Sequence, residues 1–351
     1  MKKHLSILLA VIMAGICLFG CGQKNSETSE LSTENIVDSL SSSTKETIKD
    51  SKKIKVVTTI FPEYDWVKQI VGNQISNMEL TMLLDNGVDL HSYQPTAEDI
   101  LKVSECDLFI YVGGESDAWV EDALKEAVNK DRKVINLLNV LGNSVKAEEV
   151  IEGMEAEEEH EGDKVEHAED EEIEYDEHVW LSLKNAVVLC QSISDSLQEI
   201  DPQNKDFYSA NTSAYIQQLS DLDAEYQTVT SSASQKTLLF ADRFPFRYLV
   251  DDYGLSYYAA FVGCSAETEA SFETISFLAG KVDELRLKNI MTLEKSDQKI
   301  AKTIIENTTT KDQRILTLDS MQSTTSEDIK NQTTYFSIME KNLDTLKEAL
   351  Q

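Results

Sequence analysis

The sequence has 351 residues and a formal net charge of −31, with 63 acidic against 32 basic residues. A chain with this charge would be repelled by phosphates, so we exclude a nucleic acid partner. About half of the negative charge comes from one short segment, residues 147–177, which therefore needs its own explanation.

The N-terminus has the composition of an export signal. A short basic start precedes an apolar run from Leu5 to Phe19, which at about 15 residues is shorter than the roughly 20 that span a bilayer. The run ends at Gly20-Cys21, a pattern typical of bacterial lipoproteins. We predict a signal peptide over residues 1–21 and a lipid on Cys21, with simple secretion as the alternative. The protein would then be extracytoplasmic and lipid-anchored to the cell membrane.

Residues 22–53 are rich in Ser, Thr, Glu, Lys and Asn and have few large apolar side chains. Such a segment cannot bury enough surface to fold, so we predict a flexible tether with a reach of roughly 30 Å. About 300 residues follow, which is enough for two domains or lobes.

The first half of the folded part alternates strand-like and helix-like segments. We predict strands over 54–60, 79–84, 108–112 and 133–137, and helices over 64–71, 96–104 and 118–129. This alternation is typical of a parallel sheet with right-handed crossovers.

An acidic segment follows this half. Residues 147–177 contain 17 acidic residues and one lysine, together with His160 and His167, and His178 comes directly after them. Interleaved carboxylates and imidazoles cannot form a hydrophobic core, but they attract divalent cations. We predict weak auxiliary metal sites at His160 and His167 in a solvated loop.

A long helix is predicted between the halves. Asp201-Pro202 is a good helix start, and apolar residues recur at spacings of three and four up to Val229, with no Gly or Pro in between. A helix of about 29 residues would be about 43 Å long. The alternative is two shorter helices that meet near residue 220.

The second half repeats the alternation of the first. We predict strands over 237–241, 256–262, 289–294 and 314–318, and helices over 248–253, 271–287, 298–307 and 328–350. The fold class is therefore α/β, with two lobes that each have a parallel sheet and are joined by one rigid helix. Our domain division is an N-terminal lobe (54–200, with the acidic loop 147–177), a linking helix (201–232) and a C-terminal lobe (233–351).

Three cysteines lie in the folded part, at Cys106, Cys190 and Cys264. Their odd number and wide spacing argue against a disulfide framework and against a thiolate metal site. We interpret all three as small buried hydrophobic residues.

Several polar residues follow predicted strands, where ligands bind in open α/β sheets. His91 follows the strand ending at Leu84, Arg243 follows the first strand of the second half, and Asp319 follows its last strand. Together with His178, these side chains are predicted to converge on one cleft between the lobes.

Five motifs, in order, then give a family resemblance. The sequence resembles the zinc/manganese substrate-binding lipoproteins of bacterial ABC importers, known as cluster A-I solute-binding proteins, at residues 57–62, 87–96, 178–182, 253–255 and 318–320. The resemblance covers nearly everything from Ile54 to Gln351. It implies two α/β lobes joined by a rigid helix, and one metal ion that is bound between them and delivered to a membrane permease.

The resemblance also implies a set of ligands. His91 and His178 match two histidine ligands of the first lobe, and Asp319 matches a carboxylate ligand of the second. Imidazole and carboxylate groups suit Zn²⁺, our first choice, and also accept Mn²⁺, our second.

One family ligand is missing from this sequence. Arg243 stands where the family usually has a third histidine or a glutamate, and a guanidinium has no lone pair for a metal. We expect Arg243 to pair with Asp319 or with a loop carboxylate, or to bind an anion. Asp242 and Glu294 are possible substitutes near the ligand site; Glu267, Glu269, a water molecule or His160 are further alternatives.

Two other functions compete with metal transport. A metallohydrolase would use similar ligands, but the sequence has no His-Glu-x-x-His motif and no serine nucleophile turn, so we predict that the protein is not an enzyme. The alternative that we retain is a surface adhesin of the same fold that has lost or altered metal binding.

Overall fold

The computed structural model describes residues 53–125, 127–155, 174–265 and 269–351. The predicted signal peptide, Cys21, nearly all of the tether, His160 and His167 lie outside these residues. Within the part that is described, no helix has both the length and the apolar character needed to cross a membrane.

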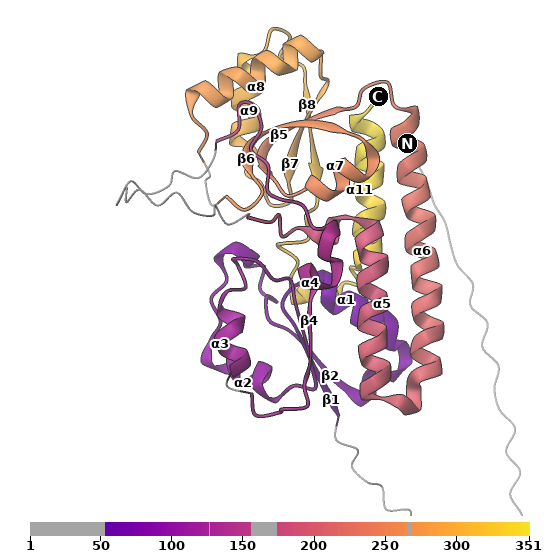
Figure 1. The fold of residues 1–351 in the computed structure, drawn as a ribbon. Coiled ribbons are helices and arrows are strands. Elements are labelled where there is room, and N and C mark those ends of the chain that lie inside the picture. Colours follow the sequence, from indigo (N-terminus) through magenta and orange to yellow (C-terminus); the bar gives the residue numbers. More distant parts are fainter. Residues whose placement is uncertain (1–52, 126, 156–173, 266–268) are drawn as a thin grey trace, which may run out of the picture. The chain divides into compact units, whose positions relative to one another are not determined.

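The first lobe is built on a four-stranded parallel sheet with the order β2-β1-β3-β4 (Figure 1). Its strands are β1 (Ile54–Thr58), β2 (Met78–Met82), β3 (Leu108–Tyr111) and β4 (Lys133–Asn136). Its helices are α1 (Phe61–Val71), α2 (Ala97–Glu105), α3 (Trp119–Lys125) and α4 (Leu137–Leu141). Helix α1 begins three residues earlier than predicted because Pro62 is accommodated in its first turn, where no intrahelical donor is needed.

The second lobe repeats this arrangement in the order β6-β5-β7-β8, again all parallel. Its strands are β5 (Thr237–Phe244), β6 (Ser256–Val262), β7 (Asn289–Leu293) and β8 (Arg314–Leu318), with helices α7 (Arg247–Tyr253), α8 (Phe272–Leu285) and α9 (Lys299–Asn307). The predicted fold class is confirmed, whereas the domain boundaries stay predictions. Strand β5 runs past the predicted end at Ala241, and its pairing register with β6 shifts between Phe240 and Arg243. Arg243 is therefore the second-last residue of the strand and does not follow it.

Helix α5 (Leu183–Ile200) leads into α6 (Lys205–Ser232), a single helix of 28 residues. The alternative of two helices that meet near residue 220 is wrong, because no Gly or Pro interrupts the ladder and one stripe of side chains stays buried from Tyr208 to Thr230. The helix contacts both lobes (Figure 1): Asn211 donates to Ile70 O of α1 at 2.9 Å, and Asp223 accepts from Tyr253 OH of α7 at 2.8 Å.

The predicted C-terminal helix over 328–350 is wrong as a single element. It is two helices, α10 (Ser326–Lys330) and α11 (Tyr335–Ala349). Gln332 adopts a positive φ of 67°, which a continuing α-helix does not allow, and Thr334 then caps α11 by accepting from Ser337 N. At the start of α11, Tyr335 N donates to Asp65 of α1 and Tyr335 OH donates to Trp180 O. A second helix therefore ties the lobes together beside α6.

Short 3₁₀ segments complete the structure: η1 (Gly72–Asn77), η2 (Leu90–Ser92), η3 (Gly142–Ser144), η4 (Val179–Leu181) and η5 (Pro202–Asn204). Two of them, η2 and η4, carry or adjoin the predicted histidine ligands.

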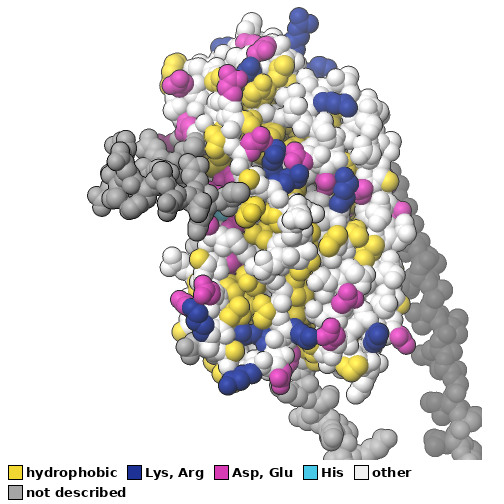
Figure 2. Space-filling view, viewed as in Figure 1, with side chains coloured by type: hydrophobic (Ala, Val, Ile, Leu, Met, Phe, Trp, Pro, Cys, Tyr) yellow, Lys and Arg dark blue, Asp and Glu magenta, His cyan; other side chains and the backbone are white. Residues whose placement is uncertain are grey.

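On the face shown in Figure 2, Lys and Arg side chains are interspersed with Asp and Glu, so that this face presents no continuous basic surface.

Candidate metal centre

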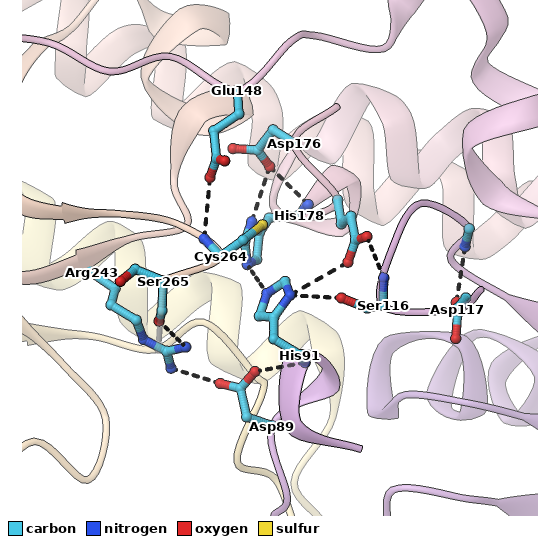
Figure 3. A network of polar contacts seen from close by, with 12 residues as sticks. Asp89, His91, Ser116, Asp117, Glu148, Asp176, His178, Arg243, Cys264 and Ser265 are labelled. Carbon is cyan, nitrogen blue, oxygen red and sulfur yellow. Dashed lines mark hydrogen bonds and ion pairs between the residues drawn. The ribbon is translucent and has the colours of Figure 1, made fainter. Parts of the chain in front are cut away.

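The two predicted histidine ligands meet in the structure. His91 lies in η2, in the loop after β2, and His178 is the residue before η4, which leads into α5. Their Nε2 atoms are 3.2 Å apart (Figure 3). The side chain of His178 is fully buried and that of His91 is 10% exposed, so the pair is nearly shielded from solvent.

Hydrogen bonds to the other ring nitrogen orient both imidazoles. Nδ1 of His178 lies 3.0 Å from Oδ1 of Asp176, and Nδ1 of His91 lies 2.8 Å from Oγ of Ser116 and 3.5 Å from Oε2 of Glu177. Because a carboxylate can only accept, the contact with Asp176 places the proton of the His178 ring on Nδ1 and leaves its lone pair on Nε2. The hydroxyl of Ser116 can accept from Nδ1 of His91, and in that tautomer the lone pair of His91 is on Nε2 as well.

With both rings in this tautomer, two lone pairs face each other at 3.2 Å. Without a proton or a cation between them, such nitrogens repel each other. Around a tetrahedral zinc ion with Zn–N bonds of about 2.0 to 2.1 Å, two nitrogens are about 3.3 Å apart, which is close to the separation seen here.

The electrostatic surroundings favour a cation. Burial, and next the neighbouring His178, lower the pKa of His91 to about 3, so that this ring is neutral near pH 7. The carboxyl groups of Asp176, Glu177 and Asp117 are all at most 3% exposed, and burial raises the pKa of Asp117 to about 7. The side chain of Glu177 packs directly against the backbone of Gly114. A Cβ at that position would lie 2.3 Å from Oε1 of Glu177, so only glycine fits there.

Arg243 pairs with a carboxylate of the loop that carries His91 and not with Asp319. Its Nη2 lies 2.6 Å from Oδ2 of Asp89, and its Nη1 donates to Ser265 O at 3.2 Å. Asp89 in turn accepts from the backbone N of His91 at 3.0 Å. Burial would raise the pKa of Asp89, but the Arg243 guanidinium outweighs it and holds the pKa below its ordinary value. Both side chains line a cavity of about 470 Å³ between the lobes.

The three predicted carboxylates lie at strand ends but contact other groups. Oδ1 of Asp319 accepts from Met321 N at 2.8 Å, and Oδ2 of Asp242 accepts from a backbone N at the end of β7 at 3.2 Å. Glu294 accepts from both N and Oγ of Ser320, and burial, followed by the nearby Asp319, raises its pKa to about 7. Within the described residues, none of the three belongs to the group of possible metal ligands that contains the histidines.

That group contains a cysteine that the sequence analysis had interpreted as a core residue. One ligand atom each from His91, His178 and Cys264 lie within 4.8 Å of one another. Gln322 was also missed: its side-chain amide lies 2.5 Å from Oδ2 of Asp89 and 2.6 Å from Nε2 of His178. Cys264 lies two residues after the end of β6, and this position at a strand end was the signal that could have indicated it.

The stem of the acidic loop, residues 147–155 and 174–177, pairs with itself and lies against the second lobe. Ala147 pairs with Tyr175, and Glu155 pairs with Phe261 of β6, where Glu155 N donates to Ala260 O at 2.9 Å. Gly153 packs so tightly that a Cβ there would lie 2.1 Å from the ring of Phe277. The first limb of the loop therefore covers part of β6, up to the boundary of the described residues.

Fold and site together define a class of protein. Two α/β lobes with the same strand order are held together by α6 and α11, and two buried imidazoles meet where the lobes face each other. This is the architecture of a two-lobed substrate-binding protein.

Comparison with known proteins identifies the family. The family model described as zinc-uptake complex component A, periplasmic, matches residues 56–349. The high-affinity zinc uptake system protein ZnuA of Bacillus subtilis is 32% identical over 308 residues, which cover 86% of this chain and 89% of that protein. The zinc-binding protein AdcA of Streptococcus pyogenes is 31% identical over 300 residues, 84% of this chain but only 56% of the relative. This chain thus spans about half the length of the streptococcal relatives.

A solved structure agrees with these matches. The Zn(II)-bound ZnuA-like domain of Streptococcus pneumoniae AdcA has a TM-score of 0.65 and 30% identity, covering 85% of this chain and 99% of that one. The chain belongs to the family of zinc-uptake complex component A, and the resemblance inferred from the sequence is confirmed.

Proposed function

We propose that the protein is an extracytoplasmic receptor that binds one Zn²⁺ ion at His91 and His178 and delivers it to the permease of an ABC importer. The observation that carries this proposal is the pair of Nε2 atoms that face each other at 3.2 Å, each on a ring whose Nδ1 is held by an oxygen atom. Membership of a zinc-uptake family supports the transport role.

Zinc is the preferred ion because neutral imidazoles at tetrahedral spacing suit it well. Mn²⁺, the alternative, is better served by oxygen ligands than by this pair. The ion is cargo, so the proposal includes no enzymatic activity. Adhesion is not favoured, since the relatives named above carry zinc-binding or zinc-uptake names.

The remaining parts of the proposal concern the membrane and the acidic loop. A lipid on Cys21 would hold the receptor close to its permease, and His160 and His167 would bind cations weakly and reversibly near the main site. The strand ends of the second lobe would be held by three carboxylates that accept hydrogen bonds from backbone N–H groups: Asp319, Asp242 and Glu294.

Zinc titration of the purified protein, in competition with a chromophoric chelator, tests the proposal. We expect one tight site in the parent protein, loss of that site in His91→Ala and in His178→Ala, and its retention when only residues 156–173 are deleted. This deletion leaves the stem of the loop in place, including Gly153 and its contact with Phe277.

A double variant His160→Ala/His167→Ala is the matched control for the loss of two histidines. It should lower the number of weak sites and leave the tight site intact. The proposal is wrong if the parent has no tight zinc site, or if the tight site survives both of the single substitutions at His91 and His178.

A further inference from the structure

Two histidines are too few for a zinc site, since three protein ligands is the usual minimum. We propose that Cys264 supplies the third protein ligand of this centre, as a thiolate donated by the second lobe. The inference rests on the proposed function, because it completes the site at which zinc would bind.

The geometry of β6 brings Cys264 to the histidines. A Cβ on Gly263 would lie 3.0 Å from Cε1 of His178 and 2.9 Å from Phe244 O, so the backbone passes directly against the imidazole ring. The next residue is Cys264, and Figure 3 shows its sulfur beside the ring of His178. Cys264 N donates to Oε1 of Glu148 at 3.2 Å, which fixes the residue to the ordered stem of the acidic loop.

The possible ligand atoms are nearly as close together as those of a zinc site, so that a small movement would bring them to coordination distance. The three possible ligand atoms lie within 4.8 Å of one another. With a Zn–S bond of about 2.3 Å and a Zn–N bond of about 2.05 Å, tetrahedral angles require an S···N separation of about 3.6 Å. A rotation of the cysteine side chain or a shift of about 1 Å between the lobes brings the sulfur into range.

The arginine at the end of β5 explains why the third ligand would come from the neighbouring strand β6. Arg243 lies at the end of β5, pairs in register with Phe261 of the neighbouring β6, and directs its guanidinium at Asp89. A cation at that position cannot bind a metal, whereas the end of the adjacent strand lies within reach of both imidazoles.

The other two cysteines of the folded part have different surroundings. Cys106 is buried in the first lobe and its thiol contacts Val103 O at 3.2 Å, and Cys190 is fully buried in α5. Only Cys264, among these three, lies beside possible metal ligands in the described residues.

The binding step is an exchange of a proton for a metal ion. The S–H bond of Cys264 breaks, a Zn–S bond forms, and the proton passes to solvent; nothing is oxidised or reduced. Two neutral imidazoles and one thiolate leave a single positive charge on the zinc centre. A thiolate also selects Zn²⁺ over Mn²⁺, because Mn²⁺ prefers oxygen ligands.

Cobalt substitution tests the inference on the parent protein without any variant. With Co²⁺ in the tight site, a thiolate ligand should give sulfur-to-cobalt charge-transfer absorption in the near ultraviolet. X-ray absorption of the zinc form should show one sulfur scatterer at about 2.3 Å.

The variant Cys264→Ala should lose the charge-transfer band and bind zinc more weakly by more than the roughly 10- to 100-fold that loss of an outer-shell partner costs. The matched control Cys190→Ala, which removes a sulfur from the core, should keep both the band and the affinity.

The outcomes separate this inference from the proposed function. Tight zinc binding without sulfur in the zinc and cobalt spectra would overturn the role of Cys264 and leave the receptor standing. Unchanged affinity in Cys264→Ala would do the same. The absence of tight zinc binding in the parent would overturn both.

Discussion

Asp176 should control zinc affinity without touching the ion. Its Oδ1 accepts from Nδ1 and from the backbone N of His178, at 3.0 and 2.8 Å, and the residue is only 2% exposed. In Asp176→Ala both bonds are lost, so that the ring can rotate and can carry its proton on Nε2. Loss of such an outer-shell partner typically costs 10- to 100-fold in metal affinity, or about 1.4 to 2.8 kcal/mol.

The conservative variant Asp176→Asn sharpens this prediction. An amide oxygen can still accept from both groups while the negative charge is lost, so we expect a zinc affinity between those of the parent and Asp176→Ala, measured by chelator competition. Asp201→Asn is the control, because it removes the same charge near the far end of α5, about 27 Å along the helix from its start. Equal zinc affinity in Asp176→Ala and the parent would refute the view that Asp176 positions His178.

Three further variants test other contacts. Burial raises the pKa of Asp65 from 3.8 to about 6, so its stabilising contribution is complete well below pH 3.8 and is lost as the pH rises through 6. Relative to Asp65→Asn, the parent should lose roughly 2.4 kcal/mol of unfolding free energy between pH 4 and 7 in urea denaturation, and parallel curves would contradict this. Gly263→Ala should displace His178 and weaken zinc binding by roughly tenfold or more, whereas Gly280→Ala, where a Cβ has open space, should not. Arg243→Ala should lower the free energy of unfolding by about 1 kcal/mol and keep one tight zinc site, since its partner Asp89 is not a ligand; loss of that site would make Arg243 essential.

Much of the fold could be predicted because local pattern and global fold agree. The strands follow the apolar runs, and α6 follows an unbroken apolar spacing just after η5, which contains Pro202. The C-terminal helix was predicted too long because Gln332 breaks it by its backbone conformation, and glutamine gives no warning of a positive φ. Just after this break, Tyr335 hydrogen-bonds to Asp65 of α1 and to Trp180 O, and such tertiary contacts cannot be read from a single sequence.

The site was predictable only in part. The resemblance gave His91 and His178, which the structure brings together, but topology alone did not distinguish which residues at the second lobe's strand ends face them. Cys264 was dismissed because thiolate sites are usually recognised by paired cysteines close in sequence. A mixed site with one thiolate has no such spacing, and only the position of its strand end reveals it.

The stem of the acidic loop has a consequence for how this chain can vary. Ala147 and Tyr175 are paired, and Glu155 is fixed on β6, so both ends of the intervening segment are set by contacts outside it. The cost of closing a longer loop rises by only about 0.6 kcal/mol for each doubling of its length. Residues could therefore be inserted, removed or exchanged for others of different charge between these anchor points while His178, three residues beyond Tyr175, keeps its place. The composition of the segment between these anchor points can therefore change, for example with the amount of metal in the surroundings, without changing the residues that hold the ion.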